Sequence, residues 1–397
     1  MALLPERNSS SLHIRCAAGR FFHSGYSPFP VSFRLRAPVY DMRILHFVNN
    51  INLSWYNMFL DTVRAQEAQG HFVRVVFPPG GVNYKRLVGD NVNVSSLPVR
   101  SSKLDYWAAL KLSRMLRAER IDVLHTHLTS SAQLGSAAAR WASIPCVASV
   151  LKITKKQRYM KCSMLLPCSG YVYDDLRAQG VPESFMRRVY TGIDLDRVLR
   201  GHDPADSARA EFGWDASHKV IGSVARLVPM KGHTHLLDAA PLVLEKHPEA
   251  RFLIVGDGEL RPGLEDQARR LGVADKVVFA GTRLDLHRIL NAMDISALAS
   301  VDKEGLPIIL VESCLFEKPA VMSDVAGIRE IIKHGQTGWL VPPRDHAALA
   351  AALCDALDNP DRAAAMARAA RDLTAREFDV KNTVKQIQEI YEQLIHS

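Results

Sequence analysis

The chain has 397 residues, of which 47% are hydrophobic and 23% charged, and its formal net charge is +8. This length exceeds what one ordinary hydrophobic core organises and predicts two domains. The composition is that of a soluble globular protein and excludes a fibrous or largely disordered one. The six cysteines form no CxxC pair, which argues against a disulfide framework or a structural zinc finger and predicts a cytoplasmic location.

The positive charge is concentrated in the first half of the chain. Residues 42–195 carry 20 Lys and Arg against 10 Asp and Glu, whereas residues 196–397 carry 25 against 30. The basic half predicts contact with an anionic membrane or a phosphorylated acceptor, the alternative being a solvated basic face. Nucleic acid is not expected, because no nucleic-acid-binding motif accompanies the charge. No segment has the roughly 20 consecutive apolar residues of a membrane-spanning helix, so the expected contact is peripheral, on the inner face of the membrane.

Residues 1–41 are set apart from the rest by their composition. They are rich in Arg and Ser and lack the apolar core of a secretory signal. Met42 then opens MRILHFV, a run typical of a buried first strand. We expect residues 1–41 to be a disordered extension or the product of an upstream start codon, with a transit peptide as the alternative.

From Met42 onward, short apolar runs alternate with segments of helical periodicity, which predicts parallel sheets covered by helices on both faces. In the first half, helices are expected over 54–69 and 103–119, and strands over 43–48, 72–77, 122–127, 145–150, 163–168 and 187–192. After a polar segment at 201–206, strands are expected over 218–226, 251–256, 276–281, 295–300, 319–323 and 338–342. The predicted fold class is therefore α/β, with two Rossmann-like doubly wound domains over 42–200 and 201–379. A last helix over 380–397 is a candidate to pack back on the first domain.

Two cations follow the first predicted strand of the second domain. Ligands of open parallel sheets bind beyond the carboxyl ends of the strands, and Arg226 and Lys231 lie at such a place, five residues apart. A guanidinium grips phosphate oxygens bidentately, whereas an ammonium acts as a point charge. The pair suits a diphosphate, with a solvated cationic turn as the alternative. The glycines in Val255-Gly256-Asp257-Gly258-Glu259 are a weaker signal, more typical of a turn.

A second strand end carries two glutamates around an apolar segment. Glu304 and Glu312 flank Gly305, Leu306, Pro307 and Ile308, and the segment from Leu306 predicts a buried helix whose free N–H groups suit a phosphate. Eight residues span roughly 12 Å along a helix, more than the roughly 5 Å between the carboxyl groups of a retaining glycosidase. The spacing favours two ends of one long ligand, sugar and ribose, with a diphosphate between. The alternative is a capping and a structural glutamate.

These motifs resemble those of family 4 of the retaining glycosyltransferases. The resemblance rests on Arg226-x4-Lys231, on Glu304-x7-Glu312, and on the segments 323–330 and 335–338, in that order. It implies the GT-B architecture, in which two Rossmann-like domains face across a cleft, and a transferase that moves a sugar from a nucleotide-sugar donor to an acceptor hydroxyl with retention. Such enzymes assemble lipopolysaccharides, glycolipids and polysaccharides, so a carbohydrate or glycolipid acceptor is expected.

The resemblance also assigns residues. Arg226 and Lys231 would hold the donor diphosphate, Glu304 would contact the donor sugar and Glu312 the ribose, and the segment with Gly281, Arg283 and Leu284 would border the base. It implies no cofactor and no metal.

The acceptor side departs from the family pattern. Residues 49–56 replace a usual glycine pair, Leu151 stands where many members have a His, and Thr191 replaces an Asn. Asn50 and His127 are the acceptor-side candidates, with a structural histidine as the alternative for His127. These departures leave open a non-catalytic binding subunit, and a further alternative is a sugar phosphorylase or nucleotide-sugar epimerase on the same fold.

Overall fold

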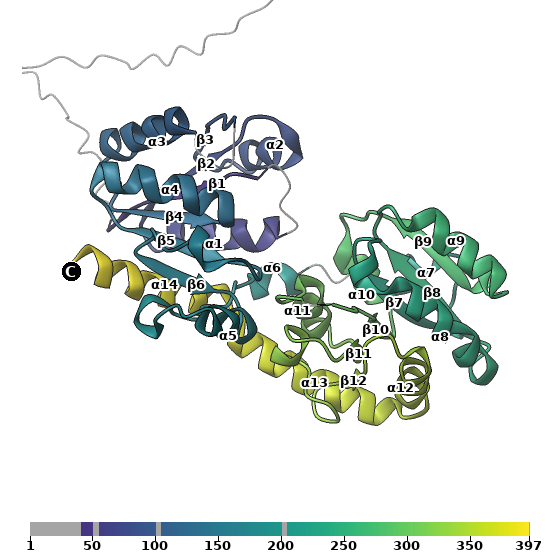
Figure 1. The fold of residues 1–397 in the computed structure, drawn as a ribbon. Coiled ribbons are helices and arrows are strands. Elements are labelled where there is room, and N and C mark those ends of the chain that lie inside the picture. Colours follow the sequence, from purple (N-terminus) through teal and green to yellow (C-terminus); the bar gives the residue numbers. More distant parts are fainter. Residues whose placement is uncertain (1–40, 51–54, 101–104, 201–204, 303, 397) are drawn as a thin grey trace, which may run out of the picture. The chain divides into compact units, whose positions relative to one another are not determined.

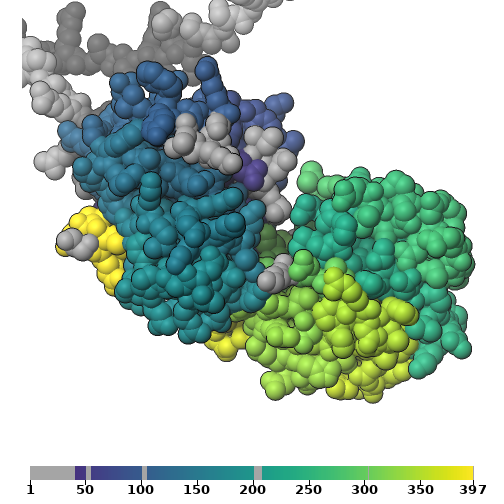
Figure 2. All heavy atoms as spheres, in the orientation of Figure 1, coloured from purple at the N-terminus to yellow at the C-terminus, as the bar shows by residue number. Residues whose placement is uncertain are grey.

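The computed structural model describes residues 41–50, 55–100, 105–200, 205–302 and 304–396, and the remaining residues are grey in Figures 1 and 2. Apart from Asp41, the predicted extension at 1–41 lies outside the described residues. So do residues 51–54 of the loop that departs from the family pattern.

The described strands form two six-stranded parallel sheets (Figure 1). The first has the order β3-β2-β1-β4-β5-β6 and the second the order β12-β11-β10-β7-β8-β9. The strands are β1 (Arg43–Val48), β2 (Phe72–Phe77), β3 (Val94–Ser96), β4 (Val123–His127), β5 (Cys146–Val150), β6 (Met164–Pro167), β7 (Lys219–Val224), β8 (Ala250–Val255), β9 (Val277–Gly281), β10 (Ile295–Leu298), β11 (Ala320–Ser323) and β12 (Trp339–Val341).

Helices connect these strands and close the chain. They are α1 (Tyr56–Ala68), α2 (Gly81–Gly89), α3 (Tyr106–Ala118), α4 (Thr129–Ala142), α5 (Gly170–Ala178), α6 (Leu195–Leu199), α7 (Ala205–Glu211), α8 (His233–Lys246), α9 (Arg261–Arg270), α10 (Leu286–Ala292), α11 (Ile308–Leu315), α12 (His346–Asp358), α13 (Pro360–Glu377) and α14 (Val380–Ile395). Side chains begin several of them in the usual way: Asp105 accepts from Ala108 N at α3, and Ser169 from Val172 N at α5. None of the described helices is long and apolar enough to span a membrane.

The predicted fold class is confirmed, because strands buried on both faces alternate with helices in each sheet. All five residues of β4 are buried, as expected of a central parallel strand.

Three local predictions were incomplete or wrong. The predicted strand at 187–192 does not form. Arg187 N and Val189 N donate to the carbonyls of Leu165 and Pro167 of β6, but Pro167 has no N–H group and cannot donate the reciprocal hydrogen bond of a strand pair. The short strand β3 was not predicted. Helix α11 begins at Ile308 rather than Leu306, because Pro307 is its N-cap residue and a proline disfavours the helical conformation of the residue before it.

The last helix packs on the first sheet. Ile387, Ile390 and Tyr391 of α14 share a buried apolar cluster with Ile44 of β1 and Val123 of β4, and α14 also contacts α1. In Figure 1 the yellow α14 accordingly lies beside elements of the first domain. This packing brings a C-terminal tyrosine to the face of the sheet where β1 and β4 carry histidines.

Candidate functional site

The loops after β7 and β8 touch at the carboxyl edge of the second sheet. A Cβ on Gly256, whose φ is +132°, would lie 2.0 Å from the carbonyl oxygen of Ala225, and one on Gly258 would lie 2.4 Å from that of Leu227. Leu227 N donates to the carbonyl of Asp257 over 2.9 Å. The two glycines therefore allow a close backbone approach that positions the neighbouring Arg226.

Close backbone contacts at glycines also join the loops after β7, β10 and β11. A Cβ on Gly232, at φ +65°, would lie 1.9 Å from the Ala299 carbonyl oxygen, and Val301 N donates to the carbonyl of Met230. A Cβ on Gly327 would lie only 1.4 Å from the carbonyl oxygen of Gly305. Backbone contacts that only glycine permits thus hold the strand-end loops together.

Lys231 and Glu304 form an ion pair where these loops meet. Lys231 ends the 3₁₀ turn η3 (Pro229–Lys231), and its Nζ contacts Oε1 of Glu304. Both side chains are largely buried, with 15% and 6% exposed respectively. Ser300 Oγ donates to Glu304 Oε2 over 3.3 Å. The structure therefore brings together two residues that the sequence assigned to the diphosphate and to the donor sugar.

Arg226 is the exposed cation of the same edge. No hydrogen bond or ion pair of its side chain occurs within the described residues, whereas Lys231 is paired. The start of α11 adds the backbone of Leu306, Pro307 and Ile308, and Gly327 N donates to the carbonyl of Glu304. Leu310 N donates to the carbonyl of Pro307 over 3.0 Å, so the N–H groups at the start of α11 without a partner within the helix are those of Ile308 and Ile309, and such groups suit an anion.

Glu312 lies on α11 and is 8% exposed. Burial raises the pKa of its carboxyl group to about 7, against the opposing attraction of Arg197. Arg197 itself is committed to Asp61, through Nε at 2.8 Å and Nη2 at 2.7 Å. Glu312 is therefore a buried carboxyl group without a hydrogen-bonding partner among the described residues, which is consistent with a ligand-binding role.

The segment expected to border the base follows β9. Gly281 ends the strand with φ +66°, and its carbonyl accepts from Gly256 N over 2.8 Å. The Arg283 guanidinium binds both carboxylate oxygens of Asp285, at 2.8 and 2.7 Å, and also pairs with Glu211. Arg283 is thus committed to protein carboxylates, whereas Leu284 is 91% exposed. Of the two side chains, Leu284 is the one free to contact a flat base.

The acceptor candidates lie at the carboxyl ends of two central strands of the first sheet: His127 is the last residue of β4, and Asn50 follows β1. The preceding Asn49 is held by Ser131, whose Oγ accepts from Asn49 N over 2.7 Å, and Asn50 is exposed. His127 is 5% exposed, and its ring lies 5.3 Å from that of Trp55 and 5.2 Å from that of Phe59, measured between centroids.

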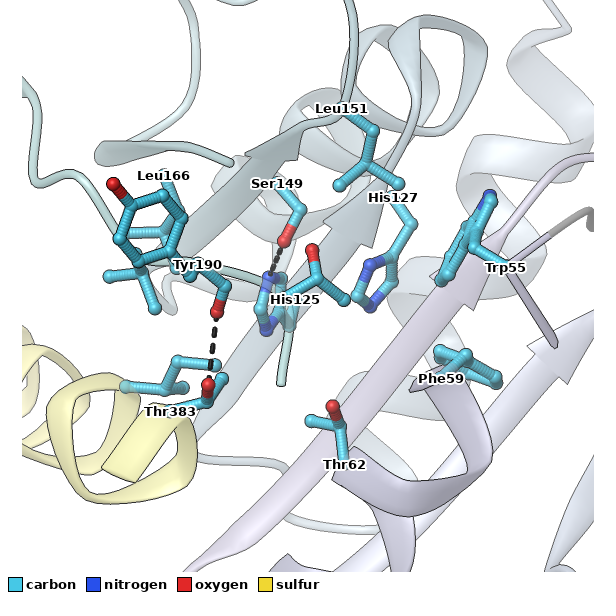
Figure 3. A pocket seen from close by; sticks show the side chains of 13 residues that line it. Trp55, Phe59, Thr62, His125, His127, Ser149, Leu151, Leu166, Tyr190 and Thr383 are labelled. Atoms are coloured by element: carbon cyan, nitrogen blue, oxygen red, sulfur yellow. Dashed lines mark hydrogen bonds between the residues drawn. The ribbon is translucent and has the colours of Figure 1, made fainter. Parts of the chain in front are cut away.

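A small cavity lies beside His127, and Figure 3 shows the side chains that line it. Its volume is about 20 Å³, and its walls include Trp55, His125, Ser149 and Thr383 besides His127. Sequence reasoning missed His46 and His125, which lie on the same face of the sheet as His127. The available signal was the alternation in His125-Thr126-His127, because alternate residues of a strand point to one face.

Two family descriptions match the chain in tandem. The model described as "Glycosyltransferase Family 4" matches residues 57–197, and the model described as "Glycosyl transferases group 1" matches residues 205–373. Together with the two parallel sheets and the paired donor-side charges, these matches show that the chain belongs to family 4 of the glycosyltransferases and has the GT-B fold.

Relatives in sequence are named as glycosyltransferases. The UDP-Gal:alpha-D-GlcNAc-diphosphoundecaprenol alpha-1,3-galactosyltransferase of Escherichia coli is 25% identical over 72% of this chain and 79% of its own. The GDP-mannose-dependent alpha-(1-6)-phosphatidylinositol monomannoside mannosyltransferase of Mycolicibacterium smegmatis is 32% identical over 48% of this chain and 52% of its own. The chain is a glycosyltransferase, and the alternatives of a non-catalytic subunit, a phosphorylase or an epimerase are not favoured.

Solved structures share the fold. HepE of Anabaena, in complex with UDP and glucose, superposes with a TM-score of 0.78 at 22% identity, covering 89% of this chain and all of the other. A glycosyltransferase from Rickettsia africae superposes with a TM-score of 0.80 at 19% identity, covering 89% of this chain and 98% of the other.

Proposed function

We propose that this chain transfers a hexose from a nucleoside diphosphate sugar to a membrane-anchored glycolipid, with retention of the anomeric configuration and without a divalent metal at the diphosphate. The observation that carries the proposal is the contact between Lys231 and Glu304, which joins the carboxyl ends of β7 and β10. A donor in this place would exchange the carboxylate partner of Lys231 for phosphate oxygens. Glu304 would then be free to accept hydrogen bonds from the sugar hydroxyls.

The diphosphate is neutralised by the protein itself in this proposal. Arg226 adds an exposed guanidinium to the ammonium of Lys231, and the start of α11 adds backbone N–H groups. Two fixed positive charges and a helix N-terminus match the roughly two negative charges of a diphosphate ester. Glu312 accepts hydrogen bonds from the ribose, and Leu284 packs against the base.

Transfer with retention needs no second carboxylate as nucleophile. The bond from the anomeric carbon to the diphosphate oxygen breaks, and the bond to the acceptor oxygen forms on the same face of the sugar. The acceptor hydroxyl gives its proton to the departing phosphate oxygen, so that a nucleoside diphosphate and a glycoside result. Arg226, Lys231 and the α11 N-terminus stabilise the charge that develops on the leaving group.

A glycolipid acceptor is supported by the surface of the first domain. Tyr106 and Trp107 at the start of α3 are 63% and 74% exposed. Trp107, Lys111 and Arg114 follow one another at helical spacing and are all exposed. Aromatic rings and basic side chains on one helix face suit the interface of an anionic bilayer. The E. coli and M. smegmatis relatives carry lipid acceptors in their names, which agrees with a site of action at the inner face of the membrane.

The test is a matrix of donors and acceptors. UDP- and GDP-activated hexoses are each incubated with the chain, with and without a bacterial lipid extract, and the released nucleoside diphosphate is measured. We expect release that depends on the extract, and a product whose anomeric proton coupling matches that of the donor. Release without acceptor, or a product of inverted configuration, would contradict the proposal.

A further inference from the structure

Three histidines meet inside the first domain, away from the cations of the donor side. His46 of β1 and His125 of β4 are register partners in adjacent strands, and His127 follows two residues after His125. Their exposed fractions are 0%, 0% and 5%. Strand alternation places all three side chains on one face of the sheet, which α1 and α14 cover. Neither the donor site nor the transfer step uses His46 or His125.

The spacing of the three rings suits one shared ion. One nitrogen from each ring lies within 4.8 Å of the other two, and His46 Nδ1 lies 2.9 Å from His127 Nε2. Two nitrogens bound to one tetrahedral zinc at about 2.0–2.1 Å lie about 3.3 Å apart. The centroid of the His46 ring lies 5.1 Å from that of His125 and 5.2 Å from that of His127, and the stacked rings of His125 and His127 are 4.4 Å apart. An ion between His46 and His127 therefore requires those nitrogens to separate by only a few tenths of an ångström.

Neighbouring side chains orient two of the rings. Gln66 Oε1 accepts from His46 Nε2 over 2.7 Å, which leaves Nδ1 of His46 as the lone-pair nitrogen that faces His127. A hydrogen bond on the far ring nitrogen is the usual support of a metal-binding histidine. His125 has Tyr391 OH at 2.5 Å from Nδ1 and Ser149 Oγ at 2.8 Å from Nε2. It can bind an ion by giving up one of these partners.

A further ligand position adjoins the rings. The cavity of about 20 Å³ is lined by His125, His127 and Ser149. A volume of roughly 10–15 Å³ on this measure holds one water. Three imidazoles and one water form a coordination set typical of zinc, whereas Mg²⁺, Mn²⁺ and Ca²⁺ prefer carboxylate oxygens, which this cluster of three histidines does not include.

We propose that His46, His125 and His127 bind one Zn²⁺ that ties β1 to β4 beneath α14. His46 coordinates through Nδ1 and His127 through Nε2. Without the ion, His127 Nε2 carries the proton that it donates to His46 Nδ1, and on coordination this proton moves to Nδ1 of the His127 ring. The hydroxyl that His125 releases, of Tyr391 or of Ser149, is then free to hydrogen-bond the zinc-bound water. The ion is distinct from the donor site, where protein cations neutralise the diphosphate.

The test measures metal content rather than activity. The full chain, produced without a polyhistidine tag, is incubated with excess Zn²⁺, desalted and analysed for zinc and protein. We expect about one zinc per chain. Co²⁺ in the same place should give the visible absorption of a tetrahedral site. A wild-type chain that is folded and carries essentially no zinc would overturn the proposal without recourse to any variant.

A matched pair of variants locates the ion. His127→Gln should abolish zinc binding and the rise in Tm that zinc gives the wild type, since a ligand stabilises only the state that binds it. His71→Gln is the control, because His71 is also buried, at 4% exposure, and neither of its ring nitrogens has a partner among the described residues. It should keep the wild-type zinc content. Equal loss of zinc in both variants, or zinc retained in a folded His127→Gln chain, would contradict the assignment.

Discussion

The two sheets present chemistry in different ways. In the second, charged residues lie in loops beyond the strand ends, where Gly232, Gly256 and Gly327 let the loops touch. In the first, the polar residues lie within the strands themselves, on a face covered by α1 and α14. A charged loop with glycines can be recognised in a sequence, whereas histidines inside an apolar strand resemble core residues. The donor side is therefore open to inference from sequence in a way that the histidine face is not.

The sharpest test of this comparison is the removal of Lys231. Lys231→Ala should lower turnover by roughly 100- to 1000-fold, the typical cost of losing one stabiliser of a developing anion. Its partner Glu304 would also lose its counter-charge. Turnover is measured at saturating donor, with folding checked by thermal unfolding. Lys219→Ala is the control, because Lys219 is exposed at the first residue of β7, the strand whose other end leads to Lys231. Unchanged turnover in Lys231→Ala would remove this residue from the mechanism.

The sequence was informative where local rules decide the structure. Alternating apolar runs located both sheets, and the cation pair and the two glutamates located the loops that surround the Lys231–Glu304 contact. What it could not provide depends on long-range packing. The last helix was expected to pack back on the first domain, but no local pattern indicates that the Tyr391 hydroxyl would reach His125, 266 residues away. The short β3 and the absence of a strand at 187–192 likewise depend on which neighbours a sheet edge offers.

Glu312 offers a test through pH. Its pKa is raised to about 7 by burial, so the carboxyl group is largely protonated at pH 6 and largely ionised at pH 8. Only the ionised form accepts hydrogen bonds from both ribose hydroxyls. The KM for the donor should therefore fall roughly tenfold as the pH rises from about 6 to about 8. Glu312→Gln, which does not titrate, should remove this dependence. A Glu312→Gln chain with the wild-type pH profile would assign the titration to another group.

The basic face of α3 offers a smaller effect. Lys111→Ala should weaken binding to anionic vesicles about fivefold at low salt, because one surface lysine contributes about 1 kcal/mol near such a membrane. Co-sedimentation with vesicles of anionic and of neutral lipid measures the difference. Lys246→Ala removes the same charge from the acidic half of the chain and should have no effect. Equal binding to neutral vesicles would exclude the electrostatic part of the proposal.

The smallest expected effect is that of metal removal on turnover. A nucleotide-sugar enzyme can neutralise the diphosphate with a divalent cation held by carboxylates, or with its own cations and a helix N-terminus. The donor edge offers Arg226 and Lys231, whereas the nearest acidic pair, Asp257 and Glu259, follows β8. The Asp257 carboxylate accepts from Gly258 N over 2.7 Å and lies 3.8 Å from the Arg261 guanidinium, so it already has partners.

Activity should therefore persist unchanged in excess EDTA during an assay of minutes. The zinc proposed between His46, His125 and His127 does not alter this expectation, because those buried residues take no part in binding the diphosphate. Adding back different ions separates the two sites. If EDTA abolishes turnover and Mg²⁺ or Mn²⁺ restores it, the diphosphate needs a metal, and the roles given to Arg226 and Lys231 are wrong. Restoration by Zn²⁺ alone would instead assign the loss to the histidines and leave the donor site independent of metal.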